Sequence, residues 1–445
     1  MGKKAGIPKG TRDFLPQQMR QRQAVMDTIR RVYTQHGFEP IETPTIENIE
    51  TLTGKYGEEG DQLLFKILMR GAKAASGQCD LGLRYDLTVP LSRFVAMHQH
   101  EIGSIFKRYQ IQPVFRADRP GHGRFREFYQ CDIDVIGARA PLAEISLLHA
   151  VSDVFDALKF DGIRIHLNDR RLLRALVEVC DIDLSQETTA IMAVDKLGKI
   201  GPEGVRTELC ERGISEASAQ ALLTHIGIND TNEETLSRLE HLFEGREDAQ
   251  TALRDLRVIV AACEQFGCGR ESLLVDPSLA RGLNYYTGAI FEIQAKGLDS
   301  SIAGGGRYDH LIGTFSGRDI PAVGISLGFE RICVIMQERG MFSQMPSGVD
   351  AVVTLFDAST LPASLAASRA IRTLGLSCEL YAGFDKLARQ FKYANERGAR
   401  YVVIIGSDEL SNGTLTIKDM QSGTQETGAM SSLVVRNGTL SFSQQ

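Results

Sequence analysis

No stretch of the sequence stays apolar over the roughly 18–20 residues that a transmembrane helix requires. The first residues, MGKKAGIPKG, carry charge but lack the apolar core of a signal peptide, and Gly6 stands where N-myristoylation needs Ser or Thr. A basic excess is also missing. The formal net charge of −6 argues against a broadly cationic nucleic-acid coat, although a local basic patch could still bind RNA. These absences predict a cytoplasmic protein with no membrane partner.

The eight cysteines form no Cys-x-x-Cys pair, and none clusters with histidine at the spacing of a metal site. Cys263 and Cys268 are the closest two, and buried free thiols explain them best. His98 and His100 flank Gln99, but a histidine pair without a third ligand is weak support for a metal. The sequence therefore identifies no metal ligands.

The familiar nucleotide-binding and hydrolase motifs are missing too. A Walker A loop needs Ser or Thr after its lysine, whereas Lys55 is followed by Tyr56 and Lys199 by Ile200. No GxGxxG lies between a strand and a helix, and neither GxSxG nor HExxH occurs. What remains is a set of arginine, tyrosine, glutamine and carboxylate residues without an obvious nucleophile. Such a set suits catalysis by positioning and by stabilising charge on a phosphoryl centre.

A chain of 445 residues can hold two or three domains. Residues 168–268 contain many Leu, Ala, Glu and Arg at helical spacing and only two aromatics, which predicts a helical insertion. After a linker with Pro346 and Gly348, strands and helices alternate, which predicts a separate α/β domain. We therefore expect a main domain in two parts, 1–167 and 269–345, interrupted by the insertion and followed by an α/β domain over 349–445.

The segment Phe106–Gly137 has two alternating arms around a turn that contains Pro120, Gly121 and Gly123, which predicts a β-hairpin. Side chains alternate between the two faces of a strand, so the odd positions from 129 to 135 (Tyr, Cys, Ile, Val) suit a packed face. The even positions on the second arm are Arg126, Phe128, Gln130, Asp132 and Asp134. A solvated outer face would rarely carry the aromatic in this row. We interpret this face as a ligand-binding surface.

Three later stretches combine glycine with residues suited to anions. In RGLNYY, Arg281 precedes a glycine, although a charged residue at a strand start is the simpler alternative. In GGGRY over 304–308, the glycines would let a ligand approach the backbone, and a tight turn explains them equally well. In AVGISLGFER, Arg331 falls in the first turn of a helix, where a cation is unfavourable. That placement favours anion binding.

These stretches, together with PIETPTIE around Pro44, resemble the three motifs of class II aminoacyl-tRNA synthetases, and specifically the histidyl-tRNA synthetase family. PIETPTIE is similar to the first motif, FRADRP through REFYQCDIDVIG to the second, and VGISLGFERI to the third. RGLNYY, GGGRYD and RYDLTVP are similar to signatures of the histidine enzymes. The resemblance covers essentially the whole chain. It implies an α+β catalytic domain with a mainly antiparallel sheet, a helical insertion domain and a C-terminal α/β anticodon-binding domain.

The resemblance also implies roles for individual residues. Arg116 and Arg281 would be catalytic, orienting the histidine carboxylate and holding the α-phosphate. The histidine-binding residues would be Asp86, Thr88, Gln130, Asp134, Tyr285, Tyr286 and Tyr308. The ATP-binding residues would be Arg116, Asp118, Arg126, Phe128, Arg281 and Arg331. Asp118 stands where many relatives carry glutamate, and Asp132 receives no role.

The activity that the resemblance implies is the ligation of L-histidine to tRNA(His) in two steps. The histidine carboxylate would attack the α-phosphate of ATP, and the terminal ribose of the tRNA would then attack the histidyl-adenylate. No protein nucleophile is required, in agreement with the missing motifs. The resemblance further implies a homodimer formed through the first motif, ATP as a substrate and Mg²⁺ beside it.

Two alternatives to this interpretation exist, one an enzyme and one not. The enzyme alternative is a class II synthetase for another amino acid, and RGLNYY, GGGRYD and Asp134 argue against it. A catalytically silent regulatory subunit of histidine biosynthesis is the other. Such paralogues typically lack the C-terminal domain and the arginine of RGLNYY, and this chain has both. HIGI over 225–228 only touches the class I signature and has no KMSKS partner.

Overall fold

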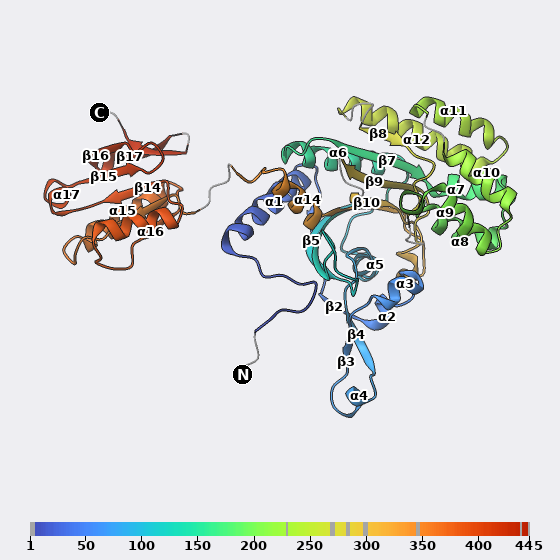
Figure 1. Ribbon diagram of the computed structural model, residues 1–445, viewed down its shortest axis with the longest axis horizontal. Helices are drawn as coiled ribbons and strands as arrows, with labels where there is room; N and C mark the ends of the chain where they lie inside the picture. Colours follow the sequence, from blue (N-terminus) through green and yellow to red (C-terminus); the bar gives the residue numbers. More distant parts are fainter. Residues whose placement is uncertain are drawn as a thin grey trace. The chain divides into compact units, whose positions relative to one another are not determined.

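The computed structural model describes residues 5–227, 230–267, 272–281, 285–296, 301–343, 348–436 and 438–443 (Figure 1). Its contacts divide the chain into two compact units, residues 1–14 with 22–339 and residues 15–21 with 340–445. Across the described ranges, no helix is both long enough and apolar enough to cross a membrane.

The larger unit is built on an eight-stranded sheet. Its strands, in spatial order, are β1 (Glu39–Pro40), β5 (Phe106–Phe115), β6 (Glu127–Ile136), β11 (Ala322–Gly328), β10 (Ser301–Arg307), β9 (Ala289–Ala295), β7 (Ile163–Asp169) and β8 (Leu273–Val275). Only the two outermost pairs, β1–β5 and β7–β8, are parallel. The expected α+β domain with a mainly antiparallel sheet is confirmed.

The hairpin predicted over 106–137 is formed by β5 and β6, which pair from Phe106 opposite Ile136 to Phe115 opposite Glu127. Apolar side chains at the odd positions of β6, such as Cys131 and Ile133, are completely buried. Helix α1 (Pro16–Gln35) contributes residues to both units, whereas α6 (Leu142–Ala157) and α14 (Phe329–Glu338) belong to the larger one. Of these, α6 and α14 pack on β6. The packed face of the second arm is therefore confirmed.

A small three-stranded sheet leads into the hairpin. It consists of β2 (Ile46–Asn48), β4 (Cys79–Leu83) and β3 (Lys66–Leu68), accompanied by α2 (Ile49–Leu52), α3 (Gly57–Gln62), α4 (Ala72–Ala75), α5 (Thr88–Met97) and, later in the chain, α13 (Gly313–Ser316). Within Leu81–Phe94 the chain changes from strand to helix, since β4 ends at Leu83 and α5 begins at Thr88.

The block between β7 and β8 is helical, as expected from its composition. It contains α7 (Arg170–Val179), η1 (Leu184–Gln186), α8 (Glu187–Val194), α9 (Leu197–Glu211), α10 (Glu216–Ile226), α11 (Asn232–Leu242) and α12 (Glu247–Gln265). Helix α7 begins where the Asp169 side chain accepts a hydrogen bond from the Arg171 amide, and α11 begins with a capping box of Thr231 and Glu234. In Figure 1 these green to yellow helices lie beside β7 and β8.

The smaller unit has the alternation predicted for 349–445. Its elements are β12 (Ala351–Val353), α15 (Leu361–Thr373), β13 (Cys378–Leu380), α16 (Leu387–Glu396), β14 (Tyr401–Ile404), α17 (Ser407–Asn412), β15 (Thr414–Asp419), β16 (Gln425–Ala429), η2 (Met430–Ser432), β17 (Leu433–Arg436) and β18 (Thr439–Phe442). A five-stranded sheet runs in the order β13-β12-β14-β15-β16, parallel over its first three strands. Val353, Val403 and Ile371 belong to its buried core.

Candidate active site

A cavity of about 450 Å³ lies within the larger unit, over β6, β11 and β10. It brings together residues from the loop before α5, the hairpin, the two later strands and the start of α14. The predicted site residues that line it are Asp86, Thr88, Arg116, Asp118, Phe128, Gln130, Asp134, Arg281, Tyr285, Tyr286, Tyr308 and Arg331. Arg126 is not among the lining residues. Its Nε donates to the carbonyl oxygen of Asp118 at 3.0 Å, so Arg126 supports the cavity wall from behind.

The even positions of β6 form one wall of the cavity, from Phe128 through Gln130 and Asp132 to Asp134. Strand β11 runs alongside, and it leaves room for this row because its facing residues are small. A Cβ atom built on Gly324 would lie 1.9 Å from Oδ1 of Asp134, so a larger residue there would displace the carboxylate. Gly324 of the third motif is therefore required by its close approach to the cavity wall.

Asp134 belongs to a buried polar group at one end of this row. Arg108, on the neighbouring strand β5, places Nη2 at 2.7 Å from Asp134 Oδ2, and both side chains are almost completely buried. The hydroxyl of Tyr308 donates to the other oxygen, Oδ1. Burial raises the pKa of Asp134, while Arg108 and then Tyr308 act against that rise. Arg108 is thus the main group that opposes the rise in the pKa of Asp134.

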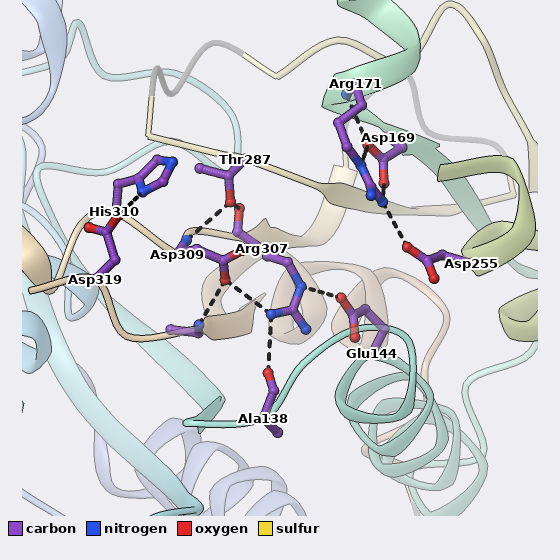
Figure 2. A network of polar contacts seen from close by, with 11 residues as sticks. Ala138, Glu144, Asp169, Arg171, Asp255, Thr287, Arg307, Asp309, His310 and Asp319 are labelled. Atoms are coloured by element: carbon purple, nitrogen blue, oxygen red, sulfur yellow. Dashed lines mark hydrogen bonds and ion pairs between the residues drawn. The ribbon is translucent and has the colours of Figure 1, made fainter. Parts of the chain in front are cut away.

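The residues on either side of Tyr308 are anchored by polar contacts, which Figure 2 shows for Arg307 and Asp309. Arg307 donates from Nε to Glu144 at 2.6 Å and from Nη1 to the carbonyl oxygen of Ala138 at 3.1 Å. Asp309 accepts a hydrogen bond from Arg307 at 3.0 Å, and the backbone N–H of Asp309 donates to the hydroxyl oxygen of Thr287 at 3.1 Å. The GGGRYD stretch thus continues from β10 into an anchored turn that aims Tyr308 at the cavity.

Asp86 and Arg116 form the opposite side of the cavity. Asp86 Oδ1 accepts from the Tyr56 hydroxyl at 3.0 Å and from the Val89 amide at 3.1 Å, and burial raises its pKa. Arg116 donates from Nε to the Tyr85 carbonyl oxygen at 3.0 Å. Its guanidinium lies over the Tyr85 ring at 4.2 Å, which limits its rotation but leaves charge available to an anion.

Arg281 lines the same cavity and lies beside β9 and β10. Its Nη1 is 3.2 Å from Glu292 and 3.3 Å from the carbonyl oxygen of Phe291. Burial alone would lower the pKa of Arg281, but Tyr286 and Glu292 outweigh burial, so the pKa of Arg281 is raised. A Cβ atom on Gly304 would meet Nη1 of Arg281 at 1.9 Å. The first glycine of the GGGRYD stretch therefore leaves the space that this guanidinium occupies. Gly282–Asn284, the middle of RGLNYY, lie outside the described residues.

The third motif supplies Glu330 and Arg331 at the start of α14. Glu330 accepts from both terminal nitrogens of Arg22 at 2.7 Å, and also from Arg12. Glu330 is thus engaged with the N-terminal region, whereas Arg331 lines the cavity and donates to the Ser301 carbonyl oxygen at 2.5 Å. Burial, followed by the nearby charge of Arg124, lowers the pKa of Arg331. A guanidinium held among like charges is suited to an anionic ligand.

Four charged residues of the cavity received no catalytic, histidine-binding or ATP-binding role from the sequence. They are Asp132, Arg124, Glu330 and Lys199. Arg124 pairs with Asp118 at 2.6 Å at the wall of the cavity. Lys199 comes from α9 of the helical insertion, and no local pattern marks it, because only the tertiary fold brings it to the cavity. Arg108, which lies behind the wall, did leave a signal, since a regular hairpin pairs it directly with Asp134.

Among the described residues, one group of side chains has the composition and spacing to hold a metal ion, namely His36, His149 and Asp153. None of the three lines the cavity. His98, considered from the sequence, pairs with Glu101 at 2.7 Å. In the cavity itself, carboxylate oxygens of the kind that Mg²⁺ prefers are present at Asp118, whose Oδ1 is paired with an arginine.

Two family models match the chain. The model for histidyl-tRNA synthetase covers residues 10–332, and a model for an anticodon-binding domain covers residues 350–436. The chain belongs to the histidyl-tRNA synthetase family. The family predicted from the motifs is confirmed, and the match to the anticodon-binding domain falls on the smaller α/β unit.

Relatives in this family match over nearly the whole chain. The histidine–tRNA ligase of Christiangramia forsetii is 40% identical over 444 residues, which cover 96% of this chain and 97% of the relative. That of Bacteroides fragilis strain YCH46 is 41% identical over 446 residues, with the same coverage. The crystal structure of histidyl-tRNA synthetase from Nostoc sp. PCC 7120 superposes with a TM-score of 0.83 at 32% identity, covering 95% of this chain and 96% of that one.

The fold is also shared with a more distant structure, described as an ATP phosphoribosyltransferase regulatory subunit/histidyl-tRNA synthetase from Bacillus halodurans C. It aligns with a TM-score of 0.74 at 21% identity and covers 87% of this chain and 96% of that one. At this identity the likeness concerns the fold alone. The higher identity and coverage of the histidine–tRNA ligases make the regulatory alternative the less supported one.

Proposed function

We propose that the chain is a histidine–tRNA ligase, which joins L-histidine to tRNA(His) at the expense of ATP through a histidyl-adenylate. The observation that supports it best is the wall formed by β6. One strand presents an aromatic ring at Phe128, an amide at Gln130 and a buried carboxylate at Asp134 to the same cavity, with Arg116 and Arg281 at its sides. Binding of histidyl-adenylate calls for an aromatic ring to stack on the adenine, polar groups to bind the histidine, and arginines to neutralise the phosphate.

In this proposal, histidine binds at the Asp134 end of the cavity. A buried carboxylate favours an imidazole ring that donates an N–H, and the ion pair with Arg108 favours the charged form of Asp134. The α-amino group is assigned to Asp86, Thr88 and Gln130. Tyr285, Tyr286 and Tyr308 complete the pocket around the ring. Because Tyr308 already donates to Asp134, it also fixes the orientation of that carboxylate.

ATP binds at the other end, with its adenine on Phe128 and under Arg331. Arg116 lies within 5.3 Å of the Phe128 ring, so one guanidinium can contact both the reacting carboxylate and the α-phosphate. Arg281 faces the developing negative charge from the opposite side. Asp118 is assigned to the ATP-bound Mg²⁺, which would neutralise phosphate charge when bound.

The chemistry then requires no covalent protein intermediate. An oxygen of the histidine carboxylate forms a bond to the α-phosphorus while the bond to the pyrophosphate oxygen breaks, and pyrophosphate leaves. Arg116 and Arg281 stabilise the charge on the phosphoryl oxygens, and because they are preorganised they act with little reorganisation in the transition state. In the second step the 3′-terminal hydroxyl of tRNA(His) attacks the histidyl carbonyl carbon, and AMP leaves.

The C-terminal unit is assigned to recognition of the tRNA anticodon, in line with the family model that matches it. We further propose a homodimer formed through the segment around Pro44, where the sequence resembles the first class II motif. The described strand β1 lies at the edge of the large sheet, so it is placed for contact with a second copy.

Amino-acid-dependent exchange of ATP with pyrophosphate tests the proposal. Across all twenty amino acids, we expect exchange with histidine alone, and we expect Arg281→Ala to abolish it. Arg254→Ala is the matched control, because Arg254 is largely exposed and pairs only with surface groups. Exchange driven by a different amino acid would refute the assigned substrate. A folded dimer that showed no exchange would favour the regulatory alternative.

A further inference from the structure

Three side chains outside the cavity converge on one point of the larger unit. They are His36, which directly follows the last residue of α1, and His149 and Asp153, which both lie on α6. His149 and Asp153 are four residues apart, so they share one face of that helix. The ligand atoms of the three side chains all lie within 4.8 Å of one another. Neither step of the proposed reaction uses any of them.

The carboxylate of Asp153 lies between the two histidines. Its Oδ2 is 2.7 Å from Nε2 of His36 and 3.8 Å from Nε2 of His149. Two ligands of a tetrahedral zinc ion lie about 3.4 Å apart, since each bond to the ion is about 2.0–2.2 Å long, and the two observed distances fall on either side of that value. Within the described residues, both ion-pair partners of this carboxylate are histidines, so a metal ion would not have to displace a lysine or an arginine.

The surroundings orient the two rings. The His149 ring stacks on Phe266 with centroids 4.4 Å apart, and it meets the His36 ring edge-on at 4.9 Å. The backbone oxygen of His36 accepts a hydrogen bond from Nζ of Lys107 at 2.7 Å, and the same ammonium group donates to Ser146 at 3.1 Å. Lys107 therefore directs its charge to these oxygens and away from Asp153. Rings that are already oriented lose less freedom when they bind an ion.

We propose that His36, His149 and Asp153 bind a divalent transition-metal ion, with Zn²⁺ as the ion that suits these donors. Two imidazole nitrogens and one carboxylate oxygen form the donor set of zinc sites that keep an open position. Asp153 and His149 are each 43% exposed, so an ion can reach them from solvent and water can complete its coordination. The ion would join the end of α1 to α6, beside Phe266 at the end of α12.

This site is separate from the Mg²⁺ proposed to accompany ATP. Mg²⁺ and Ca²⁺ prefer oxygen donors, whereas imidazole nitrogens suit zinc and its neighbours in the first transition series. None of the three residues lines the cavity. The inference therefore does not depend on the proposed activity, and each can fail without the other.

Isothermal titration calorimetry with ZnCl₂ tests the inference on full-length protein stripped of metal with EDTA. Every protein carries Cys210→Ser, because Cys210 is exposed and a thiolate can bind zinc by itself. We expect one high-affinity ion per chain. His149→Ala and Asp153→Asn should each weaken binding about a hundredfold or more, since loss of an outer-shell partner alone costs about 10–100-fold. His98→Ala is the matched control, because His98 pairs with Glu101 at 2.7 Å without a third ligand within the described residues.

Thermal unfolding gives a second readout. At a free zinc concentration a hundred times Kd, Tm should rise by about 5 °C for the wild type and for His98→Ala, and it should not rise for the two ligand variants. Millimolar Mg²⁺ should not displace the zinc. Anomalous X-ray scattering at the zinc edge should place the ion among the three side chains.

Two controls separate this test from folding and from the proposed activity. Far-UV circular dichroism of His149→Ala and Asp153→Asn should match that of the wild type, so that a loss of binding does not reflect unfolding. ATP–pyrophosphate exchange should be unchanged in both variants, because neither residue belongs to the cavity. No zinc binding by the wild type, or an affinity that neither variant weakens, would overturn the inference. Absence of histidine-dependent exchange in the wild type would instead refute the proposed activity and leave the zinc site standing.

Discussion

The buried pair of Arg108 and Asp134 offers a quantitative test of how the cavity is held together. Arg108 is 0% exposed and Asp134 2%, and their closest nitrogen and oxygen atoms are 2.7 Å apart. Replacing Arg108 by methionine removes the cation but keeps much of the volume. Asp134 would then be a buried carboxylate whose remaining partner is the Tyr308 hydroxyl. Breaking one side of such a pair costs about 3–5 kcal/mol.

The loss should depend on pH in a defined direction. Burial already raises the pKa of Asp134 in the folded protein, and removing Arg108 takes away the main opposing effect. A carboxyl group whose pKa is higher folded than unfolded favours folding at low pH, and it loses that contribution as the pH rises through its folded-state pKa. The deficit of Arg108→Met relative to wild type should therefore be larger at pH 8 than at pH 5.

Thermal unfolding followed by calorimetry suits this protein, because the sequence has no tryptophan to serve as a fluorescent probe. At about 2 °C per kcal/mol for a large domain, the expected loss lowers Tm by about 6–10 °C at pH 8. The double variant Arg108→Met with Asp134→Asn should recover part of this loss, since it leaves no unpaired charge. Arg254→Met, at an exposed pair, should change stability by no more than about 0.5 kcal/mol. A loss below about 1 kcal/mol, or no recovery in the double variant, would refute the reasoning.

Three further outcomes are expected. Gly304→Ala should reduce pyrophosphate exchange with little change in Tm, because the added Cβ meets only the movable end of the Arg281 side chain, at 1.9 Å. Gly305→Ala should lower Tm by several degrees, since its Cβ would lie 2.0 Å from the backbone oxygen of Gly324, which cannot move without disturbing the sheet. Alkylation with iodoacetamide, followed by mass spectrometry, should modify exposed Cys210 in the native protein well before the cysteines described as buried.

The hairpin shows how far sequence alone can reach. Strict alternation over Phe106–Gly137 fixed which residues of β6 share a face, and a regular two-stranded ladder then places Arg108 opposite Asp134. Those are local consequences of a period of two. The ligand-binding interpretation of this face also agrees with the cavity that the structure forms over it.

Residues that reach the cavity from elsewhere in the fold were beyond local patterns. Lys199 does not belong to a Walker A loop, because Ile200 follows it. Helix α9 nevertheless brings Lys199 to the cavity from within the insertion. Arg126 shares the alternation of β6 but precedes the strand, and its Nε donates to a loop carbonyl oxygen instead of facing the cavity.

The wall of the cavity ties the stability of the fold to the choice of substrate. A one-residue slip of β6 would move its polar row into the core and its apolar row into the cavity. Arg108 can neutralise Asp134 in only one register of the hairpin, the one observed. An apolar pair at these positions would stabilise the fold at least as well, since the attraction between two buried charges barely offsets the free energy of removing them from water. The charged pair therefore makes physical sense as a contact that fixes the register and favours the charged form of Asp134, the carboxylate proposed to meet the imidazole ring. By the same argument, changes that loosen this hairpin should weaken histidine binding before they affect ATP.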